Sequence, residues 1–97
     1  MNFHEILDGI KNQAAKTSPL GGTVKFLLGE QIIYIDGSGE ENIVSEDDVE
    51  ANCVISTSLE DMGKMMSGDL NPMMATMMGK MKIKGDMGLA MKLQSLI

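Results

Sequence analysis

Methionine is the residue whose number and spacing in this chain most need a chemical explanation. The segment NPMMATMMGKMKIKGDMG, residues 71–88, holds six methionines in eighteen positions, and ten of the chain's eleven lie between Met62 and Met91. A thioether is soft, apolar and carried on three rotatable bonds. It can therefore fill a core, ligate cuprous copper, or line a surface that adapts to ligands of varied shape.

The spacing of these methionines favours a core or an adaptable surface over a metal site. The pairs at 65–66, 73–74 and 77–78 fit helical stripes, which usually face a core. Methionine nevertheless specifies a core poorly, because its flexibility allows many near-equal packings, and the same flexibility suits a promiscuous apolar site. A copper site is disfavoured because no cysteine or histidine lies nearby in the sequence. A groove for another protein, or a dimer face, is a further alternative.

Other residue types do not form a pattern typical of catalysis or metal binding. His4 is the single histidine and has no second catalytic group near it in the sequence. Cys53 sits at an apolar position of an alternating run, which predicts a small buried hydrophobe. The turn Gly37-Ser38-Gly39 lacks the third glycine of a dinucleotide loop, and two glutamates follow it. We predict no enzymatic activity, no bound metal and no cofactor.

Length and composition predict one domain spanning residues 1–97. The apolar content is 43% and the charged content 23%, which is ordinary for a folded globular chain. No stretch approaches the roughly 18 uncharged apolar residues of a membrane span. Glu5 and Asp8 stand where a signal peptide would carry a basic end and an apolar run, so a cytoplasmic location is predicted.

Charge is divided unevenly along the chain. Residues 30–61 hold ten acidic residues and no lysine, whereas residues 62–97 are net positive. The chain has no arginine, and its net charge is −6. Recognition of a phosphate backbone needs a basic surplus, so nucleic-acid binding is excluded from the expected functions.

Apolar periodicity predicts a helix followed by four strands in the first part of the chain. Phe3, Ile6, Leu7 and Ile10 recur at the spacing of an amphipathic helix, predicted over 2–16. β-branched and aromatic runs then predict a hairpin turning at Gly29-Glu30 and two further strands. The predicted strand segments are TVKFLLGE (23–30), QIIYID (31–36), NIVSE (42–46) and EANCVIST (50–57).

Capping residues predict three helices in the second part. Ser58, Asn71 and Asp86 each precede an apolar run and can accept hydrogen bonds from the free amides of a first turn. Pro72 suits the first position of the second of these helices. Gly68 and Gly79 suit the ends of the first two helices.

A strand and a final helix close the pattern. KMKIK (80–84) alternates strictly, which predicts a half-buried strand with Lys80, Lys82 and Lys84 on its outer face. MGLAMKLQSLI (87–97) is apolar around more than half of its helical circumference. The sheet can cover one side, so the other needs a bound apolar ligand, a membrane or a partner chain.

The order and the amino-acid sequences of these segments resemble those of the sterol carrier protein 2 family. GKMKIKGDMGLAMKLQSL (79–96) is similar to that family's Gly-Lys-x-Lys-Ile strand, Gly-Asp turn and Leu-Ala-x-Lys-Leu helix. SLEDMGKMMSGDLNPMMATMMG (58–79) resembles its two short helices around a Gly-x-Leu-x-Pro bend. The likeness covers roughly residues 20–97 and is most specific over 67–96.

The resemblance implies an α+β, sandwich-like domain: a five-stranded, mostly antiparallel sheet with helices on one side, enclosing an apolar tunnel. It also implies an intracellular lipid-binding or lipid-transfer protein whose ligand is a fatty acid, fatty acyl-CoA, sterol-like lipid, phospholipid or isoprenoid lipid. By position in the family, the lipid-binding residues are Phe26, Ile33, Ile35, Met65, Met66, Met73, Met77, Met78, Met81, Ile83, Met87, Ala90, Met91, Leu93 and Gln94, the last meeting the ligand head.

Two partner hypotheses accompany the lipid carrier. Lys80, Lys82 and Lys84 are expected to give transient contact with an anionic membrane, because each lysine near such a surface adds about 1 kcal/mol. The alternative is a non-catalytic accessory or dimerisation module of a lipid- or quinone-processing complex. In that case the C-terminal helix would form a homodimer through Leu89, Leu93, Leu96 and Ile97.

Overall fold

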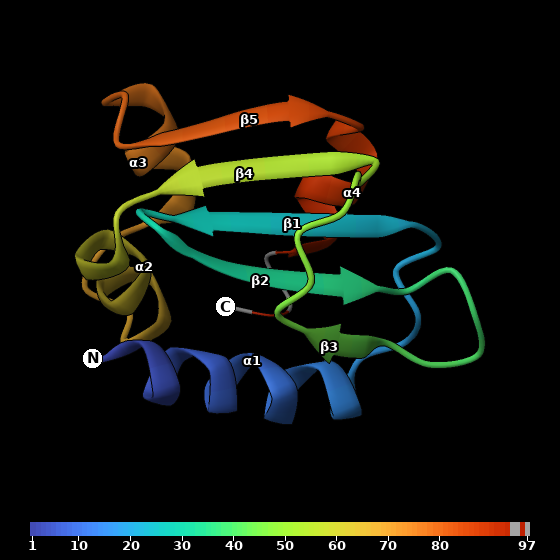
Figure 1. Cartoon of the computed structure of the whole chain (residues 1–97). Coiled ribbons are helices and arrows are strands. Elements are labelled where there is room, and N and C mark those ends of the chain that lie inside the picture. Colours follow the sequence, from blue (N-terminus) through green and yellow to red (C-terminus); the bar gives the residue numbers. More distant parts are fainter. Residues whose placement is uncertain (94–95, 97) are drawn as a thin grey trace.

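The computed structural model describes residues 1–93 and 96. Their helices and strands follow the predicted order (Figure 1). The elements are α1 (Phe3–Lys16), β1 (Thr23–Leu28), β2 (Gln31–Asp36), β3 (Ile43–Ser45), β4 (Cys53–Thr57), α2 (Leu59–Met66), α3 (Pro72–Met77), β5 (Met81–Gly85) and α4 (Met87–Lys92).

The five strands form one mixed sheet in the order β3-β2-β1-β4-β5. Every neighbouring pair is antiparallel except β1 and β4, which run parallel. The parallel pair arises because the chain leaves the edge strand β3 and crosses in front of β2 and β1 to reach β4 (Figure 1). An ion pair of 3.0 Å between Lys25 Nζ and Asp48 Oδ1 ties this crossing segment to β1. The predicted fold class is confirmed.

One face of the sheet is buried beneath the helices. Phe26 of β1 pairs with Ile33 of β2 and with Ile55 of β4, and all three side chains are buried. Side chains alternate between faces along a strand, so Lys25 and its partner Tyr34 point to the opposite face and are half-buried. The register therefore gathers the alternate apolar positions of the central strands, Phe26, Ile33 and Ile55 among them, into a single core.

Helix α1 begins where its sequence offers a capping box. Asn2 Oδ1 accepts from the Glu5 amide at 2.9 Å, and Glu5 Oε1 accepts from the Asn2 amide at 3.2 Å. The helix buries Ile6 and Ile10 completely and lies beside β3 and α2. The predicted span of 2–16 is confirmed to within the capping residue.

The three predicted caps of the later helices are all formed. Ser58 Oγ accepts from the Asp61 amide at 3.0 Å, Asn71 Oδ1 from the Met73 amide at 2.8 Å, and Asp86 Oδ1 from the Leu89 amide at 3.1 Å. Gly85, the last residue of β5, has φ +100°, and a β-carbon there would collide with the Asn52 carbonyl oxygen. The sharp turn from β5 into α4 therefore requires glycine.

The last helix is shorter than predicted over the part that the structure describes. Regular α-helix ends at Lys92, and the Leu96 amide donates to the Leu93 carbonyl oxygen at 2.8 Å. Leu89, Leu93 and Leu96 are buried in the core. The remainder of the predicted helix, at positions 94, 95 and 97, lies outside the described residues.

Candidate functional site

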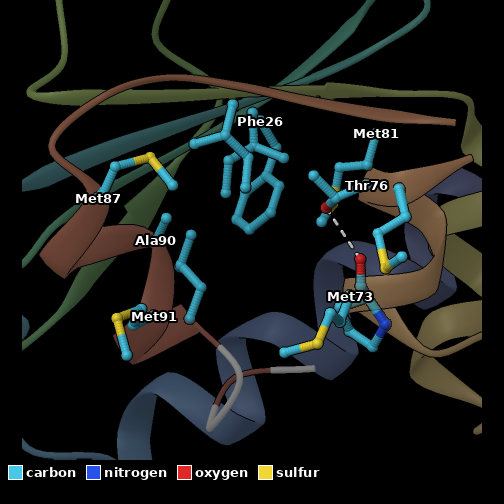
Figure 2. A pocket seen from close by; sticks show the side chains of 12 residues that line it. Phe26, Met73, Thr76, Met81, Met87, Ala90 and Met91 are labelled. Carbon is cyan, nitrogen blue, oxygen red and sulfur yellow. Dashed lines mark hydrogen bonds between the residues drawn. The ribbon is translucent and has the colours of Figure 1, made fainter. Parts of the chain in front are cut away.

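A cavity of about 220 Å³ lies between α3, α4 and the covered face of the sheet (Figure 2). Its floor comes from strands, one wall from α3 and the facing wall from α4 and the residue that follows it. The lining residues are Phe26, Ile55, Pro72, Met73, Thr76, Met77, Met81, Ile83, Met87, Ala90, Met91 and Leu93.

The floor follows directly from the strand register. Phe26 of β1, Ile55 of β4 and Ile83 of β5 occupy the same row across three adjacent strands. Neighbouring strands lie about 4.8 Å apart, so the row makes a continuous apolar strip. Met81 is two residues before Ile83 on the same face and extends the strip towards α3.

Of the four methionines on α3 and its C-cap, two line the cavity and two do not. Met73 and Met77 are four residues apart and therefore share one face of the helix. Ala75 is fully buried, which anchors the helix on the body of the protein. Met74 and Met78 are exposed and do not line the cavity.

Helix α4 divides its side chains in the same way. Met87, Ala90 and Met91 line the cavity (Figure 2 labels all three), while Leu89 packs into the core. Lys92 Nζ donates to the Leu20 carbonyl oxygen at 3.0 Å, which ties the end of α4 to the segment before β1. The wall is thus fixed at its first turn by Asp86 and at its last turn by Lys92.

The cavity combines a buried floor with an exposed rim. Phe26 is 1% exposed and Met81 6%, whereas Met77 is 77% exposed and Met91 72%. The rim side chains are held on one side only, so their thioethers are free to rotate towards or away from the opening. The geometry is that of an apolar cleft whose depth is set by rigid strands and whose mouth is set by flexible side chains.

The polar character of the cavity is small. Of the described lining side chains, Thr76 alone is polar, and its hydroxyl donates to the Pro72 carbonyl oxygen at 2.9 Å (Figure 2). None of these lining side chains carries a charge. Apolar contact is therefore the interaction that the lining offers a ligand.

Nine of the predicted lipid-binding residues line this cavity. They are Phe26, Met73, Met77, Met81, Ile83, Met87, Ala90, Met91 and Leu93. They come from four elements, β1, α3, β5 and α4 with the residue after it, and the β1–β4 and β4–β5 pairings bring the strand residues together.

Five other predicted residues lie outside the cavity lining. Ile33 and Ile35 share the covered face but sit on β2, where they belong to the closed core. Met65 is buried in that same core, and the methyl group of Met66 lies against Gly9 of α1. Met78 is the exposed C-cap of α3. Gln94 lies outside the described residues.

Sequence reasoning missed three lining residues: Ile55, Pro72 and Thr76. Ile55 had a readable signal, because it alternates with Cys53 in a strand and must share its face. Pro72 was identified as a helix start, and the position of that start at the cavity edge depends on tertiary packing.

The two groups with shifted pKa values lie away from the cavity lining. Burial, and then the negative charge of Asp86, raises the pKa of the Cys53 thiol. Hydrogen bonds from the Ser38 hydroxyl and amide lower the pKa of the Asp36 carboxyl. Among the described residues, no three His, Cys, Asp or Glu side chains gather as a metal site would require.

Comparison with known proteins gives one coherent result. The family model described as the SCP-2 sterol transfer family matches residues 3–97. Sterol carrier protein 2 of Rattus norvegicus is 44% identical over 59 residues, covering 61% of this chain and 11% of that protein. Hydroxysteroid dehydrogenase-like protein 2 of Danio rerio is 40% identical over 100 residues, covering 98% of this chain and 24% of that protein. This chain thus spans about a quarter or less of the curated relatives it matches.

Solved structures agree on the fold. The solution structure of palmitated SCP2L2 from Aedes aegypti superposes with a TM-score of 0.77 at 21% identity, covering 99% of this chain and 94% of that one. Of the helices among the described residues, none has the length and apolar character that crossing a membrane requires.

Proposed function

This chain belongs to the SCP-2 sterol transfer family, and we therefore propose that it binds one lipid in the cavity between α3, α4 and the sheet. The ligand class is a fatty acid, fatty acyl-CoA, phospholipid, or a sterol-like or isoprenoid lipid. The role is non-catalytic: the domain holds and transfers lipid. The observation that carries the proposal is an apolar lining with five methionines and one internally bonded threonine.

The energetics favour an acyl chain without a dedicated polar contact. Burying about 16 methylenes contributes roughly 12 kcal/mol at about 0.8 kcal/mol each. Association and ordering oppose binding by about 4–15 kcal/mol. At the lower end of that cost, the surplus of about 8 kcal/mol corresponds to micromolar binding by apolar contact, and the charged head of the lipid can stay at the mouth.

The size of the cavity sets a condition on binding. A volume of about 220 Å³ is below the roughly 300–1,000 Å³ of sites that enclose most of a ligand. A long acyl chain must therefore widen the cavity, and the exposed methionines are the side chains able to move. Met73, Met77, Met87 and Met91 would fold over the lipid once it has entered.

Native mass spectrometry of the freshly purified protein, followed by organic extraction, tests the proposal. We expect one lipid per chain, or uptake of one palmitate by the delipidated protein. An empty monomer that ignores added palmitate contradicts the carrier function. An empty dimer supports the alternative, an accessory or dimerisation module.

A cavity-filling variant localises the site. Ala90→Phe places a large apolar side chain into the cavity without removing a core contact, and we expect palmitate affinity to fall by at least about tenfold. Ala15→Phe, on an exposed position of α1, is the matched control and should bind normally. Equal affinity for both variants would place the lipid elsewhere.

The dimer alternative needs a surface other than the one the sequence suggested. Leu89, Leu93 and Leu96 are buried within the chain, so they are not available to a second subunit, and the fourth predicted residue, Ile97, lies outside the described residues. A dimer would instead have to cover the exposed Met87 and Met91. Such a dimer would also cover the mouth of the cavity, and lipid and partner would compete.

We also propose transient contact with anionic membranes through Lys80, Lys82 and Lys84. All three are exposed, and they adjoin the uncharged helix α3 with its exposed Met74 and Met78. Changing the three lysines to glutamine should abolish most sedimentation with phosphatidylserine vesicles at low salt. Lys11→Gln with Lys16→Gln, on α1, is the control, and equal loss in both variants would contradict a specific surface.

A further inference from the structure

Six methionines on or bordering α3 and α4 are exposed to solvent, and four of them line the cavity. The lining four are Met73, Met77, Met87 and Met91, at 64%, 77%, 58% and 72% exposed. Met74 and Met78 are exposed to a similar extent, 51% and 57%, but do not line the cavity. Solvent exposure alone therefore does not distinguish the two groups. A bound lipid would distinguish them, because it would contact only the four lining methionines.

Three other methionines of the chain are shielded. Met62, Met65 and Met81 are buried in the core or in the cavity floor. A polar oxidant in solution will therefore meet the sulfur atoms of the mouth long before those of the core. This ordering makes oxidation of the exposed methionines, the four at the mouth among them, feasible while the fold stays intact.

We propose that Met73, Met77, Met87 and Met91 form a reversible oxidation site at which a hydroperoxide switches off lipid binding. This inference rests on the proposed lipid site. In the reaction, the thioether sulfur attacks a peroxide oxygen, and an S–O bond forms as the O–O bond breaks. Sulfur is oxidised by two electrons to the sulfoxide, and hydrogen peroxide is reduced to water.

The sulfoxide changes what the mouth offers to a lipid. Its S–O dipole turns a flexible apolar side chain into a polar one. An acyl chain in the cavity would then contact sulfoxide oxygens that have lost water and gained no donor, because none of the described lining side chains has a free hydrogen-bond donor. Met73, Met77, Met87 and Met91 contribute little to the core, so binding is lost and stability is kept.

Protection by ligand is the first test. The delipidated protein is treated with hydrogen peroxide with and without saturating palmitate, and each methionine's oxidation rate is measured by peptide mass spectrometry. Palmitate is saturated and does not consume peroxide. We expect it to slow oxidation of the four mouth methionines by about fivefold or more, and to leave Met74 and Met78 unchanged.

Loss and recovery of affinity is the second test. Peroxide treatment should weaken palmitate binding by about tenfold or more. Methionine sulfoxide reductases acting on both epimers, with dithiothreitol as the reductant, should restore it: the sulfoxide becomes the thioether, its oxygen leaves as water, and the dithiol is oxidised to a disulfide. The thermal midpoint should move little. A variant that combines Met73→Leu, Met77→Leu, Met87→Leu and Met91→Leu should have the same palmitate affinity before and after peroxide treatment. The control variant, Met74→Leu with Met78→Leu, should lose affinity after peroxide as the unsubstituted chain does.

The outcomes are separable from those of the proposed function. Absence of palmitate binding before oxidation overturns both the carrier and the switch. Normal palmitate binding that persists after complete oxidation of the four sites overturns the switch and leaves the carrier. Equal protection of Met74 and Met78 would also overturn it, because the mouth would then not be the site of contact.

Discussion

The α1–α2 side of the molecule forms a closed core, whereas the α3–α4 side borders an open cavity. On the α1–α2 side, Ile6, Ile10 and Met62 are fully buried. On the α3–α4 side, Met77 and Met91 project into solvent around a cavity. Methionine therefore fills the core on the first side and forms an adjustable rim on the second. Burial, and not residue type, decides which role it has.

The largest expected effect is on the closed side. Met62→Ala removes a fully buried side chain and leaves a void, which should lower the free energy of unfolding by about 3 kcal/mol. Palmitate affinity of the folded protein should change by no more than about twofold. Chemical denaturation and a binding titration below the midpoint check both values. A large loss of palmitate affinity in the fully folded variant would contradict the separation of a core side from a lipid-binding side.

A smaller effect is expected at Asp86, where the strand β5 of the cavity floor joins the helix α4 of its rim. Asp86→Ala removes the cap of α4 and should cost about 1 kcal/mol of stability, measured by denaturation. Because α4 carries Met87 and Met91, palmitate binding should weaken as well. Asp86→Asn keeps an oxygen acceptor and should retain most of both properties. Equal losses in the two variants would point to the charge of Asp86 instead of its hydrogen bond.

On the open side, stability and binding should separate. Met77→Ala alters an exposed side chain, so stability should change by less than about 0.5 kcal/mol. Palmitate affinity should fall by about fivefold, because one apolar cover of the acyl chain is lost. Met74→Ala, on the same helix but outside the lining, should leave affinity unchanged. Matching losses in both variants would contradict a rim made of particular methionines.

The smallest effect is electrostatic and lies outside both sides. Ser38→Ala should raise the pKa of Asp36 towards its ordinary value, since Ser38 donates to that carboxylate. The folded-state pKa of Asp36 is depressed, so its contribution to stability is present above the unfolded pKa and is lost as pH falls through the folded value. NMR titration of the Asp36 carboxyl carbon measures the shift, and palmitate binding should not respond.

The sequence allowed much of the fold to be predicted because its signals are local. Ser58, Asn71 and Asp86 marked helix starts through groups only a few residues away. The alternation in KMKIK gave the correct inner face of β5, since each side-chain direction follows from its neighbour.

The candidate site was harder to predict because its boundary is a tertiary property. Met65 and Met66 have the same spacing as Met73 and Met74, and nothing local says that α2 packs on α1 while α3 borders a cavity. Met78 was assigned to the lipid site by its position in the family, but it follows Met77 by one residue and so points about 100° away around the helix. Which helix face meets which strand depends on contacts between distant segments.

Methionine methyl groups offer the most direct test of the central claim, that a lipid occupies the cavity between α3, α4 and the sheet. The protein is labelled with ¹³C at every methionine methyl, delipidated and titrated with palmitate, and the methyl signals are followed by NMR. We expect the methyl signals of the five lining methionines, Met73, Met77, Met81, Met87 and Met91, to shift and to saturate at one palmitate per chain. The signals of Met62, Met74 and Met78, which lie outside the lining, should hardly move. Saturable binding that instead shifts Met62, or that leaves all five lining methyls unchanged, would contradict it.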